Sequence, residues 1–549
     1  MLDDEHDPKG GKVRRIRRIA VVGALAMLAA ACSGGDSGVV DTTPPATSEQ
    51  TTSEQTTATS EQQPAPVEEP ARGGRLTAGT TTEPTSLDPV LETALTSYLV
   101  LLPMYDRLVR FAPDLAYEPQ VAESWSWSDD GLEVTFVLRQ DVTFHSGRAL
   151  RSADVVYSYE RWTSEEAISQ GLFANVSSVE ALDDYTVMFT LIDAAPNALL
   201  AILAANGGLL MDRDVVESNG DLRRTSGGSG PFMFGEWRSG SEIVLVANPN
   251  YWDEGKPHLD ELVFKIVPDE VSAVAALRAG EIDWFQFSDP LVATQIDGAS
   301  GLTYTESPSL AYQYLAYNFN LPPFDDPNVR QAISFALDRE AVVDLAADGR
   351  ADVTGPIVPA QTELVLPFSE FTSYSHNPQR AQQLLTEAGV TDLSVTLTAN
   401  SGNAAHVGIA PVVAEQLAAV GISVSIEMVE SGVWIDRLTT FDYDLILGSS
   451  GGAPNPDIPF GNSFMCNGPW NYSGVCDESF DELVRQVWAA SDEDRISGYH
   501  ELQRKLVNDL MPYSFLFVGR SLWGWADEVK GYEPLPLIER RFETIFIEN

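Results

Sequence analysis

The residues best suited to covalent chemistry lie in the segment GSSGG at positions 448–452, which matches the G-x-S-x-G pattern of serine hydrolases with Ser450 as nucleophile. That pattern requires a helix directly after the serine. The residues that follow, APNPDIPF, contain three prolines, which oppose a helix at this point. The only histidine further along the chain is His500, in a predicted surface helix. A secreted serine hydrolase is therefore the disfavoured alternative, and we predict a protein without catalytic residues that is not an enzyme.

Cys32 follows a segment with the three parts of a secretory signal. Basic residues between positions 9 and 18 precede an apolar run over 19–31 that ends in three alanines. The run is shorter than the roughly 20 residues of a membrane-spanning helix. A cysteine directly after small residues resembles the bacterial lipobox, although Ala29 stands where that motif usually has leucine. We predict a signal peptide over 1–31 and lipidation of Cys32; the alternatives are a plain signal peptide with an incidental cysteine and, for the export route, a twin-arginine signal.

The segment that follows Cys32 has the composition of a tether. Residues 33–72 contain TSEQ three times and no aromatic residue. Such a segment buries too little apolar surface to offset the entropy of ordering its backbone. We therefore expect a disordered tether over 32–72 that links the lipidated cysteine to a globular body. This arrangement predicts a protein anchored at the extracytoplasmic face of a bacterial cell membrane.

Cys466 and Cys476 lie ten residues apart in the Gly/Pro-containing loop MCNGPWNYSGVC. In an exported protein such a pair forms a disulfide, which for a loop of this length contributes about 3 kcal/mol in the chain-entropy model. A two-cysteine metal site is the alternative. The six histidines are scattered and none lies near the pair, so we predict no metal and no cofactor.

The composition restricts the size and the partners of the body. The 477 residues after position 72 are too many for one hydrophobic core, so two or three lobes are expected. Lys and Arg number 34 against 80 Asp and Glu, a formal net charge of −46. Because nucleic-acid affinity depends on cationic contacts to phosphate, this charge excludes a nucleic-acid partner.

Sequence periodicity divides the body into a strand-rich part and an α/β part. In the first part, strand-like alternation flanks a hairpin turn at 129–131, and a helix is predicted from Ser152. After position 320, a long amphipathic helix over 325–346 is followed by alternating helices and strands up to 429. Two further helices are expected over 479–490 and 492–509. This order predicts an α/β lobe with a partly parallel sheet beside a strand-rich lobe.

Six segments of the body form a recognisable series: EPTSLDP (83–89), DDGLEVTFVLRQDVTFHSGRALRSADVVYSYERW (129–162), GSGPFMFGEW (228–237), NPNYW (248–252), FDDPNVRQAISFALDRE (324–340) and NYSGVCDESFDELV (471–484). In this order they resemble the extracytoplasmic solute-binding proteins of ABC importers, in the oligopeptide/dipeptide/nickel-type family (family 5). The resemblance covers about residues 73–540. It implies a receptor that captures a solute and delivers it to the permease subunits of an ABC transporter, and we expect a monomer. A receptor that signals or assists folding without transport is a further alternative.

The resemblance also implies the architecture. It is a two-lobed α/β fold of the periplasmic-binding-protein type (type II, large cluster C variant) with an extra strand-rich subdomain and the ligand enclosed between the lobes. We place the first lobe at 73–317, the second at 318–522 and a return to the first at 523–549. The connections between the lobes are then expected near Leu315–Asn320 and Gly519–Trp525.

The ligand is expected to be a short peptide, with an oligosaccharide or another non-peptide solute as the alternative. Peptide-binding relatives often carry an aspartate, in a loop like aDYpdP, that pairs with the amino terminus of the ligand. Aligning Asn455-Pro456 with that motif puts Gly452 at the position of the aspartate, and Asp457 is the nearest acidic residue. The candidate ligand-binding residues are Trp434, Gly452, Asp457, Trp470, Tyr472 and Tyr317.

Overall fold

A computed structural model describes residues 70–92, 95–490, 492–537 and 539–548. The predicted signal peptide, the lipidation site at Cys32 and nearly all of the predicted tether lie outside these residues. The described residues belong to one compact unit. Within them, no helix is both long enough and apolar enough to cross a membrane.

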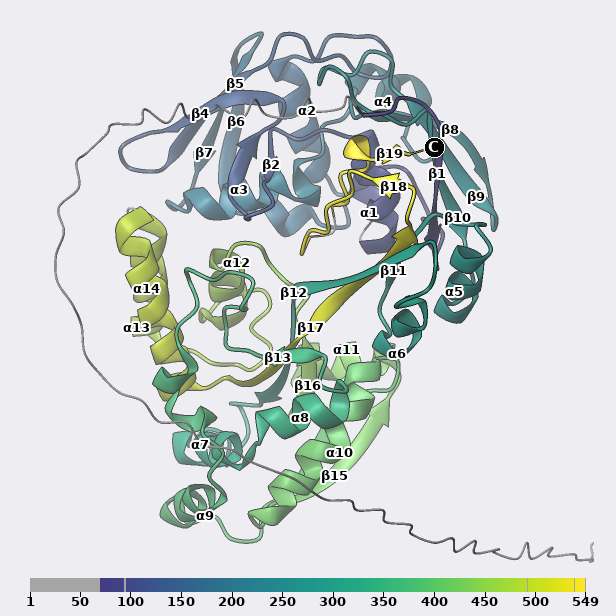
Figure 1. Ribbon diagram of the computed structural model, residues 1–549. Coiled ribbons are helices and arrows are strands. Elements are labelled where there is room, and N and C mark those ends of the chain that lie inside the picture. The colour runs from purple at the N-terminus through teal and green to yellow at the C-terminus, as the bar shows by residue number, and fades with distance from the viewer. Residues whose placement is uncertain (1–69, 93–94, 491, 538, 549) are drawn as a thin grey trace, which may run out of the picture. The chain divides into compact units, whose positions relative to one another are not determined.

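One mixed sheet of eleven strands continues through both lobes (Figure 1). Two long antiparallel strands join its halves, β12 (Leu302–Tyr317) and β17 (Tyr513–Ala526). The first-lobe strands follow β17 in the order β11 (Trp284–Phe287), β1 (Arg75–Thr80), β10 (Glu261–Ile266), β9 (Glu242–Ala247) and β8 (Phe232–Arg238). The second-lobe strands follow β12 in the order β16 (Leu445–Ser449), β14 (Ser394–Asn400) and β15 (Ser423–Val429), and β13 (Ala351–Val353) pairs with β17. The predicted two-lobed α/β fold is confirmed.

The first connection lies earlier in the chain than the sequence predicts. The pairing of β12 with β17 shifts register between Pro308 and Tyr312, where the strands pass from one lobe to the other. Beyond this point, residues from Gln313 to Tyr317 pair with β16 of the second lobe. The predicted connection at Leu315–Asn320 is therefore wrong, because its first residues already belong to the second-lobe sheet.

The first lobe carries the predicted strand-rich subdomain. Its separate sheet has the order β4 (Ala122–Trp127), β5 (Glu133–Leu138), β7 (Thr186–Leu191) and β6 (Val176–Asp183). The β4–β5 hairpin turns at Gly131, whose φ of 69° is unfavourable for residues with a Cβ. Helix α2 (Ser152–Trp162) packs on this sheet and begins where the Asp154 carboxylate accepts a hydrogen bond from the Arg151 backbone N–H at 2.9 Å. The lobe also contains α1 (Leu95–Leu101), β2 (Val109–Phe111), β3 (Tyr117–Pro119), α3 (Pro196–Ala204), α4 (Arg213–Asn219), α5 (Glu270–Arg278) and α6 (Pro290–Ala293).

The second lobe is the predicted α/β part, with β14 parallel to both β15 and β16. The expected long helix over 325–346 is instead two helices, because the Asp338 carboxylate accepts a hydrogen bond from the Ala341 N–H and starts a new helix. The helices of this lobe are α7 (Pro327–Ala336), α8 (Arg339–Ala346), α9 (Pro378–Glu387), α10 (Ala404–Ala419), α11 (Ser431–Thr440), α12 (Asp457–Pro459), α13 (Glu478–Ala489) and α14 (Asp492–Arg504). Cys466 and Cys476 form the predicted disulfide in the loop before α13.

The last residues of the chain return to the first lobe (Figure 1). Strand β18 (Val529–Lys530) pairs with β19 (Phe546–Ile547). The ring of Phe542 packs edge-on against those of Trp284 and Phe264, which belong to β11 and β10. The segment between β18 and β19 is thereby held against the first-lobe core.

Candidate functional site

A cavity of about 550 Å³ is lined by residues of both lobes. The first lobe contributes residues from α1, from β2 and from the ends of β1 and β11. The second lobe contributes Gly451, Gly452 and Pro454 from the loop after β16, and Ser309–Ala311 of β12 line the cavity at the register shift. The volume falls within the usual 300–1,000 Å³ of small-molecule sites, so the cavity is the candidate ligand site.

The C-terminal segment supplies one wall of this cavity through Pro536, Leu537, Glu539 and Arg540. Glu539 is buried and its Oε2 accepts a hydrogen bond from Arg107 Nη2 at 2.7 Å. The remaining donors of the Arg107 side chain contact the Ala204 carbonyl oxygen at 3.0 Å and Gln120 Oε1 at 3.4 Å. Burial raises the pKa of Glu539, but Arg107, Arg110 and Arg541 outweigh it, so the pKa lies below its usual value.

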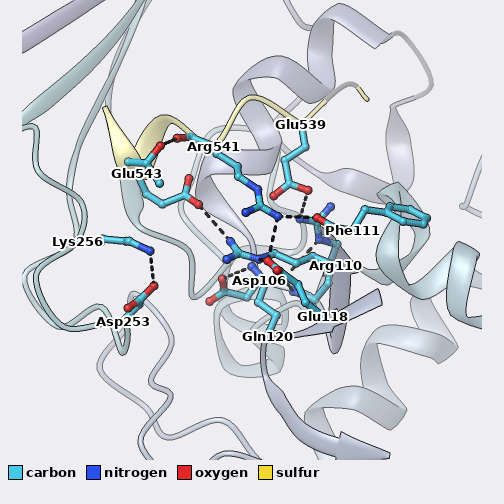
Figure 2. A network of polar contacts seen from close by, with 12 residues as sticks. Asp106, Arg110, Phe111, Glu118, Gln120, Asp253, Lys256, Glu539, Arg541 and Glu543 are labelled. Carbon is cyan, nitrogen blue, oxygen red and sulfur yellow. Dashed lines mark hydrogen bonds and ion pairs between the residues drawn. The ribbon is translucent and has the colours of Figure 1, made fainter. Parts of the chain in front are cut away.

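A further network of ion pairs fixes the same segment beyond the cavity (Figure 2). Arg110 contacts Glu118 at 2.6 Å and Glu543 at 3.1 Å, and Arg541 contacts Glu118 at 2.9 Å. Arg541 Nη2 also donates to the Phe111 carbonyl oxygen at 2.6 Å. Charges of both signs therefore alternate between the C-terminal segment and strands β2 and β3. This arrangement holds the segment in one position and, with it, the cavity wall.

The other charged residues of the lining are bound to the end of β11. Arg540 Nη2 donates to Gln286 Oε1 at 2.6 Å. The Glu270 carboxylate, at the start of α5, accepts hydrogen bonds from the Ser288 N–H at 2.9 Å and the Ser288 hydroxyl at 2.5 Å. The cavity thus presents one internal ion pair, one further cation and one further anion, set among apolar side chains such as Phe285 and Leu310.

Gly452 lines the cavity at the position where the family resemblance expects an aspartate. Its φ is +79°, which favours glycine. A Cβ at this position would lie 2.8 Å from the Leu310 carbonyl carbon and 3.0 Å from the Ala311 nitrogen. Because both contacts are with backbone of β12, an aspartate does not fit without moving the loop. The structure therefore explains why this loop carries no carboxylate here.

The neighbouring Gly451 offers a matched comparison, because a Cβ there would meet no atom within 4 Å and its φ is not positive. We expect Gly452→Ala to lower the free energy of unfolding by about 2 kcal/mol, since the substitution adds a clash to an unfavourable φ. Gly451→Ala should change it by less than about 0.5 kcal/mol. Urea unfolding of the two variants measures the difference. Equal effects would show that the approach of the loop to β12 is unimportant.

Of the six predicted ligand-binding residues, the structure brings only Gly452 to the cavity. Tyr317 is fully buried in the second-lobe core, with its hydroxyl 2.6 Å from Ser514 Oγ, so its prediction as a ligand contact is corrected. Asp457 is also buried and accepts a hydrogen bond from the Tyr499 hydroxyl at 2.6 Å. Its side chain therefore packs inside the second lobe and does not line the cavity.

The three remaining aromatic residues lie on the second lobe outside the lining of the cavity. Trp434 donates from Nε1 to the Leu447 carbonyl oxygen at 3.0 Å, which ties α11 to β16. Trp470 is 44% exposed on the disulfide loop, and Tyr472 packs partly buried against a second-lobe core cluster. The aromatic side chains in the described lining are those of Phe111, Phe285 and Phe287.

The polar residues of the cavity were not found from the sequence because they come from distant segments. Arg107 and Glu539 are 432 positions apart, and Gln286 and Arg540 are 254 apart. The one available signal was the charged run ERR at 539–541, close to the end of the chain.

The loop that carries Gly452 also contacts the first lobe directly. Asn455 Nδ2 donates to the Tyr117 hydroxyl at 2.8 Å and to the Asn197 carbonyl oxygen at 3.3 Å. Leu115 of the first lobe packs against a second-lobe cluster, and Ile458 of the second lobe packs against the first-lobe core. The lobes therefore meet beside the cavity, as a closed arrangement around a ligand requires.

Ser450 is not arranged as a hydrolase nucleophile. Its backbone N–H donates to the Tyr312 carbonyl oxygen at 2.8 Å, and the next helix, α12, begins only at Asp457. A nucleophile elbow requires the helix to follow the serine directly. The segment is part of the cavity wall instead, since Gly451 and Gly452 line it.

The two lobes share one sheet through two long strands, and a ligand-sized cavity lies between them. This arrangement is that of a solute-binding protein that holds its ligand between two lobes. The chain belongs to the bacterial extracellular solute-binding proteins of family 5, whose family model (Bacterial extracellular solute-binding proteins, family 5 Middle) matches residues 116–472. The family is one of binding proteins, in agreement with the absence of a serine-hydrolase site at Ser450.

Several relatives match more than four fifths of the chain. The oligopeptide-binding protein AppA of Bacillus subtilis is 29% identical over 496 residues, covering 85% of this chain and 90% of AppA. Its structure in complex with a nonapeptide has a TM-score of 0.71, at 27% identity, over 87% of this chain and 100% of that chain. The di/tripeptide-binding protein 2 of Pseudomonas aeruginosa is 30% identical over 484 residues, 81% of this chain and 90% of that protein. The structure of AgaA from A. tumefacien R10 in complex with agropinic acid has a TM-score of 0.73 at 26% identity, over 87% and 99% of the two chains.

Proposed function

We propose that this protein captures a short peptide between its lobes and delivers it to the membrane subunits of an ABC importer. The observation that carries the proposal is the cavity lined by both lobes in a member of a solute-binding family. Relatives similar over more than four fifths of the chain are an oligopeptide-binding and a di/tripeptide-binding protein. A lipid on Cys32 would keep the receptor at the extracytoplasmic membrane face, where tethering raises its effective concentration near the importer.

The chemistry of the lining supports a peptide. Apolar side chains such as Phe111, Phe287 and Leu537 can cover peptide side chains, and the charged groups can meet polar ends. Small-molecule sites commonly combine a mostly apolar wall with a few placed polar groups in this way.

A non-peptide solute is the second candidate, favoured by two observations. Gly452 leaves the loop without the carboxylate that pairs with a peptide amino terminus in relatives. AgaA, which has the same fold, was solved with agropinic acid. An oligosaccharide has less support, because the described lining contains no tryptophan or tyrosine on which a sugar ring could stack.

Thermal shifts of the purified protein, together with native mass spectrometry, test the proposal. We expect stabilisation by a pool of di- and tripeptides and none by an oligosaccharide pool of equal concentration. At 100 times its dissociation constant, a ligand that binds only the folded state stabilises it by about 2.7 kcal/mol. A shift with sugars alone would overturn the peptide assignment. Peptide-derived masses retained by the protein after purification would support it directly.

A further inference from the structure

Two charged side chains of the cavity wall have no oppositely charged partner of their own. Arg107 and Glu539 form an ion pair at 2.7 Å. Across the described part of the chain, by contrast, no carboxylate oxygen lies within ion-pair distance of Arg540 and no cationic nitrogen within that distance of Glu270. Both residues line the same cavity. A buried charge without a partner is costly, which makes Arg540 a candidate contact for an anion. Glu270 is only partly buried, and it presents an unpaired anion to the same cavity.

Arg540 is built to receive an anion. The residue is only 6% exposed, and its guanidinium is held by hydrogen bonds from Nη1 to the Leu537 and Glu539 carbonyl oxygens. Nη2 uses one N–H on Gln286 Oε1, at 2.6 Å. Nε is buried and has no hydrogen-bond partner among the described residues. Nη2 therefore keeps one N–H that can donate to an oxygen of a carboxylate.

Glu270 offers the opposite charge at a fixed place. Its Oε1 accepts from the Ser288 N–H and hydroxyl, and its Oε2 accepts from the Asp289 N–H at 3.0 Å. A carboxylate has about four acceptor sites, so one remains for a further donor. The side chain is half-buried and cannot leave this position without breaking three hydrogen bonds. It is therefore suited to an ammonium group.

The two groups are held at neighbouring places along the chain. Gln286, which binds Arg540, and Ser288, which binds Glu270, are two residues apart at the end of β11. Two residues of extended chain span roughly 7 Å. The wall thus carries an anion acceptor and a cation acceptor that are both held by the end of β11.

From this juxtaposition we infer that Arg540 binds the carboxylate end and Glu270 the ammonium end of a short zwitterionic ligand. Recognition of the ammonium end is thereby moved from the loop at Gly452 to the first lobe, where a carboxylate fits. The inference rests on the proposed function, because it names the end groups of the peptide. Specificity then depends on both free ends of the ligand and less on its side chains.

The test uses three pools of the same tripeptides, with free ends, with acetylated amino termini and with amidated carboxyl termini. Calorimetry and native mass spectrometry on the purified protein should show each blocked pool binding about 10- to 100-fold more weakly than the free pool, the usual effect of losing a charge-assisted contact. Arg540→Gln should bind the free and amidated pools equally, and Glu270→Gln should bind the free and acetylated pools equally. Arg213→Gln, which changes an exposed arginine of the first lobe that does not line the cavity, should keep both preferences.

The outcomes separate the inference from the function on which it rests. If the unaltered protein binds all three pools equally, peptide capture stands and the assignment of Arg540 and Glu270 is overturned. A preference that survives in Arg540→Gln or Glu270→Gln overturns the residue concerned. Binding of sugars but of no tripeptide pool overturns the proposed function itself. The comparison of pools on the unaltered protein needs no variant, so it holds even where a substitution prevents folding.

Discussion

Replacing Arg107 with methionine should release the C-terminal segment from the first lobe. The substitution leaves the Glu539 carboxylate buried without its 2.7 Å partner, although Arg110 and Arg541 still act on it. Breaking a buried ion pair by removing one partner costs about 3–5 kcal/mol. We expect the free energy of unfolding to fall by about 3 kcal/mol, which is measured as a lower unfolding midpoint. Relative to the unaltered protein, hydrogen exchange should become faster at the amides of 539–548 and change less in the second lobe. At acid pH the loss should shrink, because an unpaired Glu539 can take up a proton.

Two comparisons make this result specific. In the double variant Arg107→Met/Glu539→Gln no buried charge is left alone, so part of the stability should return. In Arg213→Met the lost partner, Glu217, is exposed, and the cost should stay below about 1 kcal/mol. A double variant as unstable as the sum of the two single variants would show that the pair is not coupled. Unchanged exchange at 539–548 would show that the pair does not hold the segment.

The second large effect concerns Asp457, a carboxyl buried in the second lobe. Burial raises its pKa to about 6, although the Tyr499 hydrogen bond and Arg495 act in the opposite direction. The unfolded chain has a pKa near 3.9 at such a residue. The folded state therefore binds the proton more tightly, and stability falls as pH rises from about 4 to about 6. We expect Asp457→Asn, which cannot ionise, to be more stable than the unaltered protein at neutral pH.

The size of that gain follows from the two pKa values. A shift of about two units corresponds to about 3 kcal/mol at pH 7.5, and to about half of that at pH 5. Urea midpoints of both proteins from pH 5 to pH 7.5 measure this divergence. Asp442→Asn removes an exposed carboxyl of the same lobe and is the control for the effect of an Asp-to-Asn substitution on stability. A difference for Asp457→Asn that stays constant from pH 5 to pH 7.5 would contradict a raised pKa at this position.

These two networks bear on how ligand capture is organised. Arg107 and Glu539 hold the cavity wall that contains Arg540, whereas Asp457 lies just after the loop that carries Gly452. The backbone N–H of Asp457 donates to Asn455 Oδ1 at 2.8 Å, and Asn455 in turn bonds to Tyr117 across the lobes. Each wall of the cavity is thus fixed by buried polar groups outside the ligand contacts themselves. Variants at these positions are expected to change stability and ligand affinity together.

The sequence by itself determined the fold class, the strand-rich subdomain and the disulfide. The alternation around Gly131, the helix from Ser152 and the helix–strand order after position 320 are local patterns. Local patterns depend on neighbouring residues that the sequence shows directly. One local prediction is wrong, because the helix expected over 325–346 is interrupted. The Asp338 side chain caps the start of a second helix.

Only the tertiary structure decided which residues face the ligand. The aromatic residues predicted from the sequence have side chains of the kind that often contact ligands. The type of a side chain does not reveal which face of its helix or strand is buried, and Tyr317 lies in the second-lobe core. The cavity wall combines Arg107, Glu270, Gln286 and Arg540, which meet because β11 and the C-terminal segment pack together. Likewise, the sequence shows only that Gly452 stands where peptide-binding relatives often have an aspartate. The close approach of β12 shows that the backbone there has no room for one.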